Sequence, residues 1–454
     1  MILKMEGLGI IKQAQIDLNK KLILFCGCNG TGKTYASYVL QAFLQDGYSF
    51  SLKCFDRILC EQREKGCFLV EKEDIMQWLA ANCQSVKEQL GGIFGISDAT
   101  VRKLFPKFTL EAIYSDDDHN TFLHSTIEVK MTKGSLYWNI SKPTDSATIT
   151  IESNEAFTDG SLHDSNVITV FCNALRMAAF CNLSEARMLT VERNSIYTFK
   201  TELSLSRNEL IDQIQQSGKS EIDIVGIINN SSRRYPQTVR NSLRIANDLE
   251  TISKNESKFA GVAAMIENDL LMGEVSMTKN GDVEFCGQGM AKSRKLPFHM
   301  SSSIVKTMAS LVIYLRHLAR IGDTLIVDEP EMNFHPDVQV LLARVFAILT
   351  AKGLRVVIST HSDYIIREIN NLIMAGAINN RNDQLLPEDM GYTPEMLLNY
   401  KDLSVLHFER RGKASVSVRS LEVDDEGFVM KTMDEAILTQ NMIAEKLYAL
   451  LSED

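Results

Sequence analysis

A short glycine-rich segment near the N-terminus has the residue types that bind a phosphate group. Residues 27–34 read GCNGTGKT, and the apolar stretch LILFC at residues 22–26 directly precedes them. In the pattern G-x-x-x-x-G-K-[ST] the glycines let backbone N–H groups turn toward phosphate oxygens, the lysine adds a positive charge, and the final hydroxyl can bind Mg²⁺. A glycine turn without function is the alternative, but the position between a predicted strand and a predicted helix favours a phosphate-binding P-loop. The residues expected to bind nucleotide here are Gly27, Cys28, Asn29, Gly30, Thr31, Gly32, Lys33, Thr34 and Tyr35.

An apolar stretch far downstream ends in two carboxylates. Residues 324–327 read TLIV and lead into Asp328 and Glu329, and Pro330 ends the predicted strand. A carboxylate at the end of such a strand can hold Mg²⁺ together with Thr34, and the next carboxylate can polarise an attacking water. Many strands end in two acids, so it is the P-loop upstream that favours a Walker B motif here. We therefore assign Thr34 and Asp328 to the metal and Glu329 to catalysis.

Two further segments contain groups that could contact a phosphate. Residues 354–358 read LRVVI and run into STHS, which predicts a strand of the same parallel sheet with His361 at its end. An imidazole there can reach a γ-phosphate and take part in catalysis, whereas a histidine that only caps the strand is the alternative. Ser301, Ser302 and Ser303 precede a helical pattern and could present hydroxyl and N–H groups to an anion. Taken alone, these serines are better explained as an ordinary N-cap.

The composition is that of an ordinary folded protein. The 454 residues are 45% hydrophobic and 23% charged, with a net charge of -10. This acidic balance argues against a uniformly basic surface for nucleic acid, although it leaves a local basic groove open. The nine cysteines lack the paired spacing of a zinc ribbon and are predicted to be free thiols. Neither a basic leader nor a run of about 18 apolar residues occurs, so the sequence predicts a cytoplasmic protein without a membrane partner.

The order of hydrophobic patterns predicts three regions. Residues 1–202 form an N-terminal lobe that contains the P-loop and an antiparallel meander at residues 125–152. Residues 203–275 are mostly helical in pattern and form an insertion, and residues 276–454 form a C-terminal lobe. The predicted fold class is therefore α/β, with a mixed parallel sheet, an antiparallel β subdomain and a helical insertion. The insertion has a cluster of arginines that we interpret as a solvated or salt-bridged face, with a surface for DNA, RNA or a partner as the alternative: Arg233, Arg234, Arg240 and Arg244.

Together these motifs resemble those of ABC-type ATPases of the SMC-like branch. The order is P-loop, serine-rich helix start, Asp-Glu strand and Ser-Thr-His strand, with a long separation between the first two. Several segments are also similar to the AAA-type ATPases of bacterial anti-phage systems such as Septu, PARIS and the overcoming-lysogenisation-defect proteins. These segments are DEPEMNFHP at residues 328–336, THSD at 360–363, VERNS at 191–195 and NNLI at 370–373.

The resemblance implies a nucleotide site shared between two copies of the chain. In such ATPases two ATP molecules, with Mg²⁺, are enclosed between two protomers, and each ATP is held by the P-loop of one protomer and the signature serine of the other. Ser301 matches that serine, and Asn333 and His335 match the loop that meets the dimer mate. The glycines of the Leu-Ser-Gly-Gly-Gln signature are replaced here by serines, which is expected to affect the hydrolysis rate more than binding. A higher homo-oligomer is a further expectation.

The leading functional hypothesis is an ATPase switch of an anti-phage defence system. Such a protein senses a phage component as its trigger and controls a separately encoded effector, for example a nuclease. The alternative is an SMC-like DNA-maintenance or repair ATPase that closes on DNA. A transporter ATPase would need shorter motif spacing and a coupling surface for a membrane subunit. A P-loop kinase is disfavoured because Glu329 beside Asp328 suits activation of water.

The residues after His361 are too few for the Toprim nuclease domain that the overcoming-lysogenisation-defect proteins carry. We therefore expect any nuclease to be another polypeptide. The acidic run DDEG at residues 424–427 lies between two alternating segments, which predicts a hairpin turn rather than a nuclease metal site. Basic residues on the preceding strands could bind a partner or nucleic acid, or could be exposed charges without a function: Arg410, Arg411, Lys413 and Arg419.

Overall fold

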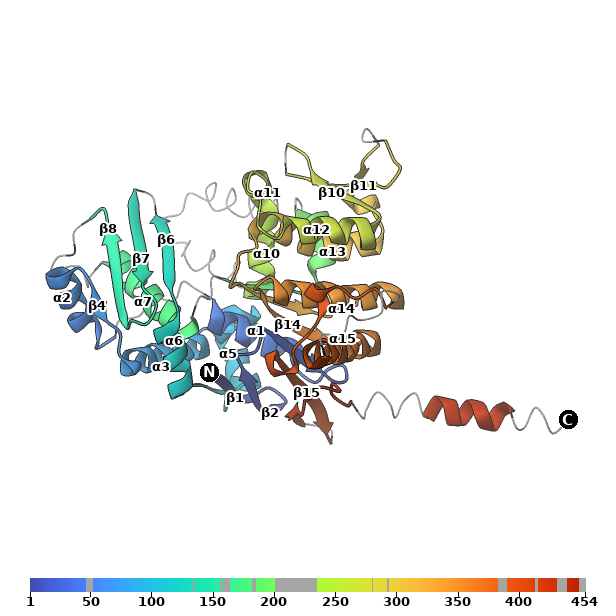
Figure 1. Cartoon of the computed structure of the whole chain (residues 1–454), viewed down its shortest axis with the longest axis horizontal. Coiled ribbons are helices and arrows are strands. Elements are labelled where there is room, and N and C mark those ends of the chain that lie inside the picture. The colour runs from blue at the N-terminus through green and yellow to red at the C-terminus, as the bar shows by residue number, and fades with distance from the viewer. Residues whose placement is uncertain are drawn as a thin grey trace.

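The chain folds around one large β-sheet that is covered by helices on both faces (Figure 1). The computed structural model describes residues 1–45, 52–133, 135–155, 157, 164–181, 185–200, 235–279, 281–291, 294–382, 390–412, 415–430 and 439–448. Three of the basic residues discussed above, Arg233, Arg234 and Lys413, lie outside the described residues. The predicted regions 1–202, 203–275 and 276–454 remain predictions.

The large sheet has nine strands in the order β5-β1-β2-β16-β15-β3-β14-β13-β9. The strands β15, β3, β14, β13 and β9 run parallel, whereas β5, β1 and β2 pair antiparallel. Because parallel strands end at the same edge of a sheet, the segments that follow β3, β13 and β14 meet there. The bounds are β1 (Ile2–Leu8), β2 (Ile11–Asp17), β3 (Leu22–Cys26), β5 (Thr109–Ile113), β9 (Ala186–Leu189), β13 (Thr324–Asp328), β14 (Arg355–Thr360), β15 (Leu403–Arg411) and β16 (Ser415–Leu421).

Alternate side chains of the central strands enter two separate hydrophobic cores. Ile23 and Phe25 of β3 pack in one core with helix α1 (Lys33–Leu44) and helix α7 (Ser165–Phe180). Leu22 and Leu24 pack in the other core, on the opposite face. That core contains α13 (Ser303–Ile313), the π-helix η4 (Tyr314–Leu318), α14 (Pro336–Ala351) and α15 (Asp363–Asn382). Burial on both faces explains why β3 and β13 are continuously apolar rather than alternating.

The predicted antiparallel meander is present as a small separate sheet on the left of Figure 1. Its strands are ordered β4-β8-β7-β6, with bounds β4 (Phe68–Leu69), β6 (Ile127–Lys133), β7 (Leu136–Lys142) and β8 (Thr148–Ser153). Helix α2 (Phe55–Lys65) contacts β4, and helix α3 (Lys72–Glu88) packs against α7 and β5. Three shorter helices complete this side: α4 (Leu90–Phe94), α5 (Asp98–Leu104) and α6 (Asp116–His124).

Helices dominate the described part of the predicted insertion. They are α10 (Gln237–Asn247), α11 (Leu249–Ile252), α12 (Ala260–Ile266) and the π-helix η2 (Glu267–Leu271). A three-stranded sheet follows, with β10 (Gly273–Met277), β11 (Val283–Gly287) and β12 (Leu296–Pro297), and then the 3₁₀ turn η3 (Phe298–Met300). Arg240 donates to the carbonyl oxygen of Gly92 at 2.9 Å, so this arginine ties α10 to the N-terminal lobe.

The predicted hairpin around the acidic run is only partly correct. The amide and carbonyl groups of Asp424 and Gly427 exchange hydrogen bonds of 3.1 and 3.2 Å, so a tight turn is present. Of the segment after Gly427 the structure describes residues 428–430, which form no strand, and β16 pairs with the preceding β15 instead. The short helices η6 (Pro394–Met396) and η7 (Tyr400–Asp402) lead into β15.

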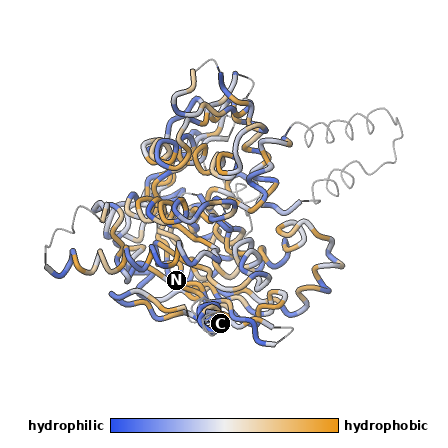
Figure 2. The backbone as a smooth tube through the Cα atoms, turned by 90° about the vertical axis from the view of Figure 1, so that its right-hand side faces the viewer, coloured by the Kyte–Doolittle hydropathy of each residue, from blue (hydrophilic) through white to orange (hydrophobic). Residues whose placement is uncertain are grey.

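The cysteines, the hydropathy pattern, the helices and the fold class complete the description of the fold. All nine cysteines are free, as predicted. Hydrophobic and hydrophilic stretches alternate along most of the chain (Figure 2), as expected of elements with one buried side. Of the helices that the structure describes, none is both long and apolar enough to cross a membrane. The predicted α/β class, with a mixed sheet, an antiparallel β subdomain and a helical insertion, is confirmed.

Close packing of helix α15 can be tested by comparing two helical glycines. A Cβ atom on Gly376 of α15 would collide with the carbonyl oxygen of Leu398, whereas Gly261 of α12 has open space at that point. We expect Gly376→Ala to destabilise the fold by about 1–3 kcal/mol through overpacking. Gly261→Ala should be neutral or stabilising by up to ~1 kcal/mol. Urea denaturation of both variants measures the difference, and equal midpoints would contradict this packing.

Candidate functional site

The P-loop connects the end of β3 to the start of α1. Its geometry requires glycine at two points in particular. Gly27 has φ +133°, and a Cβ atom there would collide with the carbonyl oxygen of Phe408 on the neighbouring β15. Gly32, the N-cap of α1, has φ +91°, and its Cβ would lie 2.9 Å from the side chain of Ile11. Since other residues rarely adopt these φ values, the glycines set the path of the loop.

The lysine of the P-loop lies against the loop itself. Lys33 Nζ donates to the carbonyl oxygens of Gly27 at 2.8 Å and Cys28 at 2.9 Å, and it lies 3.4 Å from Nδ1 of His361. The residue is only 5% exposed, and this burial lowers the pKa of its ammonium group. A phosphate in the loop would offer this ammonium stronger acceptors than neutral carbonyls.

The two predicted metal ligands lie in direct contact. Thr34 Oγ1 donates to Oδ2 of Asp328 at 2.8 Å, and Ser359 Oγ donates to the other carboxylate oxygen. Asp328 is 1% exposed, and burial raises the pKa of its carboxyl group against the opposing effect of those two hydrogen bonds. Among the described residues no group of three or more His, Cys, Asp or Glu could hold a metal. One carboxylate with one hydroxyl fits Mg²⁺, which completes its shell with water and phosphate oxygens.

Glu329 and His361 face each other at the same edge of the sheet. Oε1 of Glu329 lies 3.4 Å from Nε2 of His361, and the two side chains are 36% and 25% exposed. The loop after Glu329 also holds the histidine in place. Glu331 Oε1 accepts the backbone N–H of His361 at 2.6 Å and the hydroxyl of Thr360 at 2.9 Å. The partial exposure leaves both reactive groups open to solvent on one side.

Arg193 is a member of this cluster to which the sequence patterns assigned no role. Its guanidinium donates to three backbone carbonyls, those of Thr190 at 2.9 Å, Asp328 at 2.6 Å and Glu329 at 2.7 Å. Glu329 has φ +45°, a left-handed conformation that costs a residue with a side chain about 1–3 kcal/mol. Burial lowers the pKa of Arg193 to about 10, opposed by the surrounding carboxylates, so the group stays charged at neutral pH. The signal in the sequence was the VERNS segment at residues 191–195, which carries no chemical pattern of its own.

The three serines lie apart from the P-loop. Ser302 is the N-cap of α13, and Ser302 and Ser303 are exposed. Ser301 is 6% exposed, and its hydroxyl has no hydrogen-bond partner among the described residues. No hydrogen bond within the described chain joins these serines to Lys33 or Asp328. Contact with a nucleotide in another protomer therefore remains a prediction, and in this conformation only Ser302 and Ser303 are at the surface.

Most of the remaining predicted residues lie at the surface. Asn333 is exposed and has φ +65°, and His335 is exposed beside Asp337 at 3.2 Å. Tyr35 is 40% exposed and packs edge-on against the ring of Phe94 at 5.1 Å. Cys28, Asn29 and Gly30 are exposed, Thr31 is buried and Gly32 is half-buried.

Basic residues of the C-terminal strands differ in their surroundings. Arg410 donates to the carbonyl oxygen of Gly30 at 3.2 Å, so it lies at the P-loop. Arg419 and Arg411 lie 3.4 and 3.9 Å from Glu409. These arginines were predicted either to bind a partner or nucleic acid or to be exposed charges without a function. In the structure they contact other residues of the same chain.

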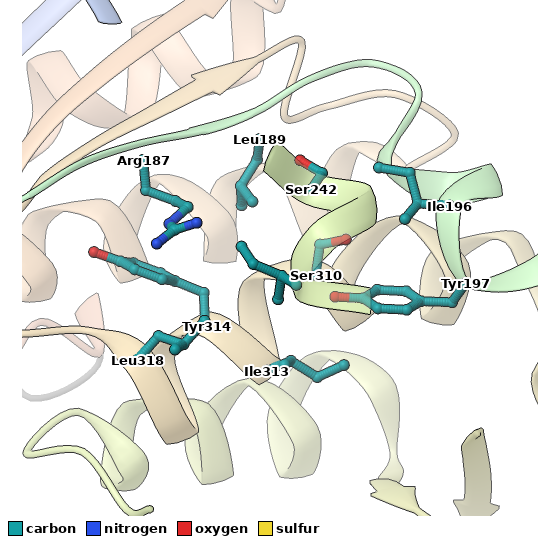
Figure 3. Close-up of a pocket in the computed structure, with 10 residues that line it drawn as sticks. Arg187, Leu189, Ile196, Tyr197, Ser242, Ser310, Ile313, Tyr314 and Leu318 are labelled. Atoms are coloured by element: carbon teal, nitrogen blue, oxygen red, sulfur yellow. The ribbon is translucent and has the colours of Figure 1, made fainter. Parts of the chain in front are cut away.

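A cavity elsewhere in the molecule is not the candidate site. It lies between β9, α10, α13 and η4, where Leu189, Tyr197, Ser310 and Tyr314 line it (Figure 3). Its volume is ≈ 20 Å³, which holds about one water molecule and is far too small for a nucleotide. The groups suited to phosphate chemistry lie instead on an open edge of the sheet.

Comparison with known proteins identifies one domain family. Residues 183–366 match the model of the AAA ATPase domain. The matched residues include β13, β14 and Arg193, whereas the P-loop lies outside them. No curated protein gives a match.

Solved structures of SMC head domains align with the chain at low identity. The Smc head domain of Pyrococcus furiosus with an extended coiled coil, bound to the C-terminal domain of ScpA, is 10% identical with a TM-score of 0.36 and covers 98% of each chain. The SMC head domain from Thermotoga maritima is 9% identical with a TM-score of 0.31 and covers 93% of this chain and 98% of its own. An SmcHead bound to the C-winged helix domain of ScpA is 13% identical with a TM-score of 0.38 and covers 93% and 97%.

The described structure has the α/β fold class that the sequence predicted, with the strand, loop and helix order expected of a P-loop ATPase. The mixed sheet, the P-loop after β3 and the acidic pair at the end of β13 agree with that class. The AAA ATPase domain match over residues 183–366 supports the same ATPase class from the sequence side.

Removing the ammonium of Lys33 tests the P-loop. We expect Lys33→Ala to weaken ATP binding roughly 10- to 100-fold, because a charge-assisted contact with the phosphates is lost. Fluorescence titration with a labelled ATP analogue measures the affinity. Lys21→Ala is the matched control, because Lys21 precedes β3 at its other end and is paired with Asp402 at 2.9 Å. Equal affinity of Lys33→Ala and wild type would contradict the assignment.

The buried carboxylate of Asp328 gives a pH-dependent prediction. Since burial raises its pKa, the folded protein holds this proton more tightly than the unfolded chain. Its contribution to stability is therefore present below about pH 4 and is lost as the pH rises through the folded pKa. The amide of Asp328→Asn can still form hydrogen bonds with Thr34 and Ser359. Because it does not titrate, the variant does not lose this stability as the pH rises. Without nucleotide, we expect the denaturation midpoint of the variant, relative to wild type, to be higher at pH 7 than at pH 4.

The exposed Asp337→Asn provides the control for that measurement, since the side chain of Asp337 is 88% exposed. Its midpoint relative to wild type should hardly change with pH. If the midpoint of Asp328→Asn relative to wild type is instead lower at pH 7 than at pH 4, the two hydroxyl donors lower the pKa of Asp328 by more than burial raises it.

Proposed function

We propose that this chain binds and hydrolyses ATP and acts as a nucleotide-dependent switch that controls a separately encoded effector in anti-phage defence. The observation that carries the hydrolysis part is the meeting of four groups at one sheet edge: Lys33, the Thr34–Asp328 pair, Glu329 and His361. These groups come from segments far apart in the sequence. Each has the chemistry that phosphoryl transfer to water requires.

The proposed reaction assigns one task to each group. Lys33 and the N–H groups of the loop bind the β- and γ-phosphates, at the start of α1 where the helix dipole favours an anion. Thr34 and Asp328 would hold Mg²⁺, which neutralises phosphate charge when bound. Glu329 accepts a proton from the attacking water. The oxygen of that water bonds to the γ-phosphorus while the bond between the γ-phosphorus and ADP breaks. His361 donates a hydrogen bond to a γ-phosphate oxygen.

An ATP-sandwich homodimer is the proposed active form. Glu329 and His361 are partly exposed, and Ser302, Ser303 and Asn333 are exposed. This open arrangement supports a site that a second copy completes across a two-fold axis. Hydrolysis removes the γ-phosphate that bridges the two copies, so the dimer has two states that nucleotide can select.

The defence role rests on the resemblance of the motifs to ATPases of anti-phage systems. In that proposal the trigger is a phage component and the effector is a nuclease-type protein. The acidic run at residues 424–427 forms a turn, in which Asp425 is paired with Arg381. The separate effector is therefore proposed from the resemblance of the motifs alone.

The switch can be trapped by a single substitution. We expect Glu329→Gln to keep ATP affinity but to lower turnover about 10²- to 10⁴-fold, because the proton acceptor is lost. With ATP and Mg²⁺ the variant should elute as a stable dimer in size-exclusion chromatography with light scattering. The control Lys33→Ala should remain a monomer. A monomeric Glu329→Gln that binds ATP normally would contradict the sandwich dimer.

The effector is tested by co-purification from a host that contains the native locus. Wild type and Glu329→Gln are isolated, and bound proteins are identified by mass spectrometry. A stoichiometric nuclease-type partner, held or released according to the variant, is the expected result. Recovery of the chain with DNA and without a protein partner would instead favour the DNA-maintenance function.

A further inference from the structure

We propose that Arg193 is a positioning residue for hydrolysis, which holds the backbone after β13 so that the Glu329 carboxylate faces the γ-phosphate. This inference rests on the proposed ATP hydrolysis and extends it to a residue that touches neither nucleotide nor metal.

The guanidinium fixes both sides of the peptide unit that carries the catalytic acid. It donates to the carbonyl oxygen of Asp328 at 2.6 Å and to that of Glu329 at 2.7 Å. The N–H of Glu329 is held from the other side by the carbonyl oxygen of Ser359 at 2.9 Å. With its N–H and its C=O both fixed, Glu329 is kept at φ +45°. That angle turns its side chain out of the strand and toward His361, 3.4 Å away.

Only an arginine has the geometry for this task. Arg193 is 3% exposed, and its planar group reaches three carbonyls at once, including that of Thr190. A lysine ammonium is a point charge on a flexible chain and cannot span two successive carbonyls in the same fixed way. Three buried or half-buried acids also act electrostatically on its positive charge, namely Asp328, Glu329 and Glu331.

The arginine is itself held in place by the helical residues 193–200. Two apolar residues of that segment, Ile196 and Tyr197, are buried beside α13, and both line the small cavity of Figure 3. The Tyr197 ring meets the ring of Phe298 edge-on at 5.7 Å. Phe298 begins the turn that leads to Ser301, so one short segment connects the serine-containing surface with the backbone of the catalytic acid.

The competing explanation is that Arg193 serves only the stability of the fold. A buried arginine with three carbonyl partners could simply satisfy those acceptors. The two explanations differ in what they predict for turnover in a protein that is still folded and still binds ATP.

The experiment compares Arg193→Gln and Arg193→Lys with wild type in ATP affinity and steady-state turnover. We expect kcat to fall roughly 10- to 100-fold, as for a small misplacement of a catalytic group. The dissociation constant of ATP should stay within about threefold of wild type, since no phosphate contact is removed. The matched control is Arg176→Gln, because Arg176 is equally buried at 3% and donates to the carbonyl oxygen of Leu44, outside the site. It should keep its kcat.

A double-mutant cycle with Glu329→Gln separates positioning from stability. If Arg193 acts through Glu329, adding Arg193→Gln to Glu329→Gln should cause no further loss of residual turnover. Unchanged kcat in both arginine variants, or full additivity in the cycle, would overturn the proposal. So would a joint loss of ATP binding and turnover in both variants, which would assign Arg193 to the fold. Absence of turnover in wild type would instead count against the proposed ATPase itself.

Discussion

The carboxylate of Asp328 is the constraint on which the site depends. It is buried at the carboxyl edge of the sheet, where an isolated charge would be strongly disfavoured. It persists because Thr34 at the start of α1 and Ser359 at the end of β14 donate hydroxyl groups to it. Those two donors tie β3, β14 and β13 together at the edge where the phosphates would lie. The same contacts that satisfy a buried acid therefore set the spacing of the metal ligands.

A second group of contacts supports the residues that face the nucleotide. Arg193 holds the backbone of Glu329 in a left-handed conformation that costs about 1–3 kcal/mol. Glu331 holds the backbone of His361 and the hydroxyl of Thr360. Hydrogen bonds to charged groups contribute about 1.5–3 kcal/mol each, enough to offset this strain. The proposed catalytic pair, Glu329 and His361, is thus pre-organised by residues that lie beneath it, whereas its outer side stays open.

Much of the fold was predictable because its elements have strong local patterns. The mostly apolar runs at residues 22–26, 324–327 and 354–358 predicted buried strands, and polar residues at their ends had to meet if the strands were parallel. The alternating runs at residues 125–152 predicted the meander for the same local reason. The predicted second strand of the hairpin is not formed by residues 428–430, the part of it that the structure describes, and β16 has its antiparallel partner in β15. Pairing between strands is decided by tertiary contacts, which the alternation of side chains does not encode.

The supporting residues of the site were not predictable in the same way. Arg193 and Glu331 act on backbone groups, and such contacts leave no spacing rule in the sequence. Arg410 was predicted only as an exposed charge or a docking residue, since nothing in the sequence indicates that β15 lies beside β3 and the P-loop. Motifs report groups that touch the substrate directly. The residues that hold those groups become visible only when the sheet order is known.

The open side of the proposed catalytic pair is compatible with the proposed switch. A closed, fully lined pocket would hydrolyse ATP whenever it was bound, whereas this edge exposes Glu329 and His361 together with Ser302 and Ser303. In the proposed dimer, activity would depend on the approach of a second surface, and closure would bury phosphate charge between two copies. The short segment from Arg193 to Tyr197 contacts the turn before the serines and holds the backbone of the catalytic acid. Within one protomer, therefore, the same short segment supports two parts of the proposed site. One is the serine-containing surface, which would meet the partner's nucleotide, and the other is Glu329, which would act on the protomer's own nucleotide.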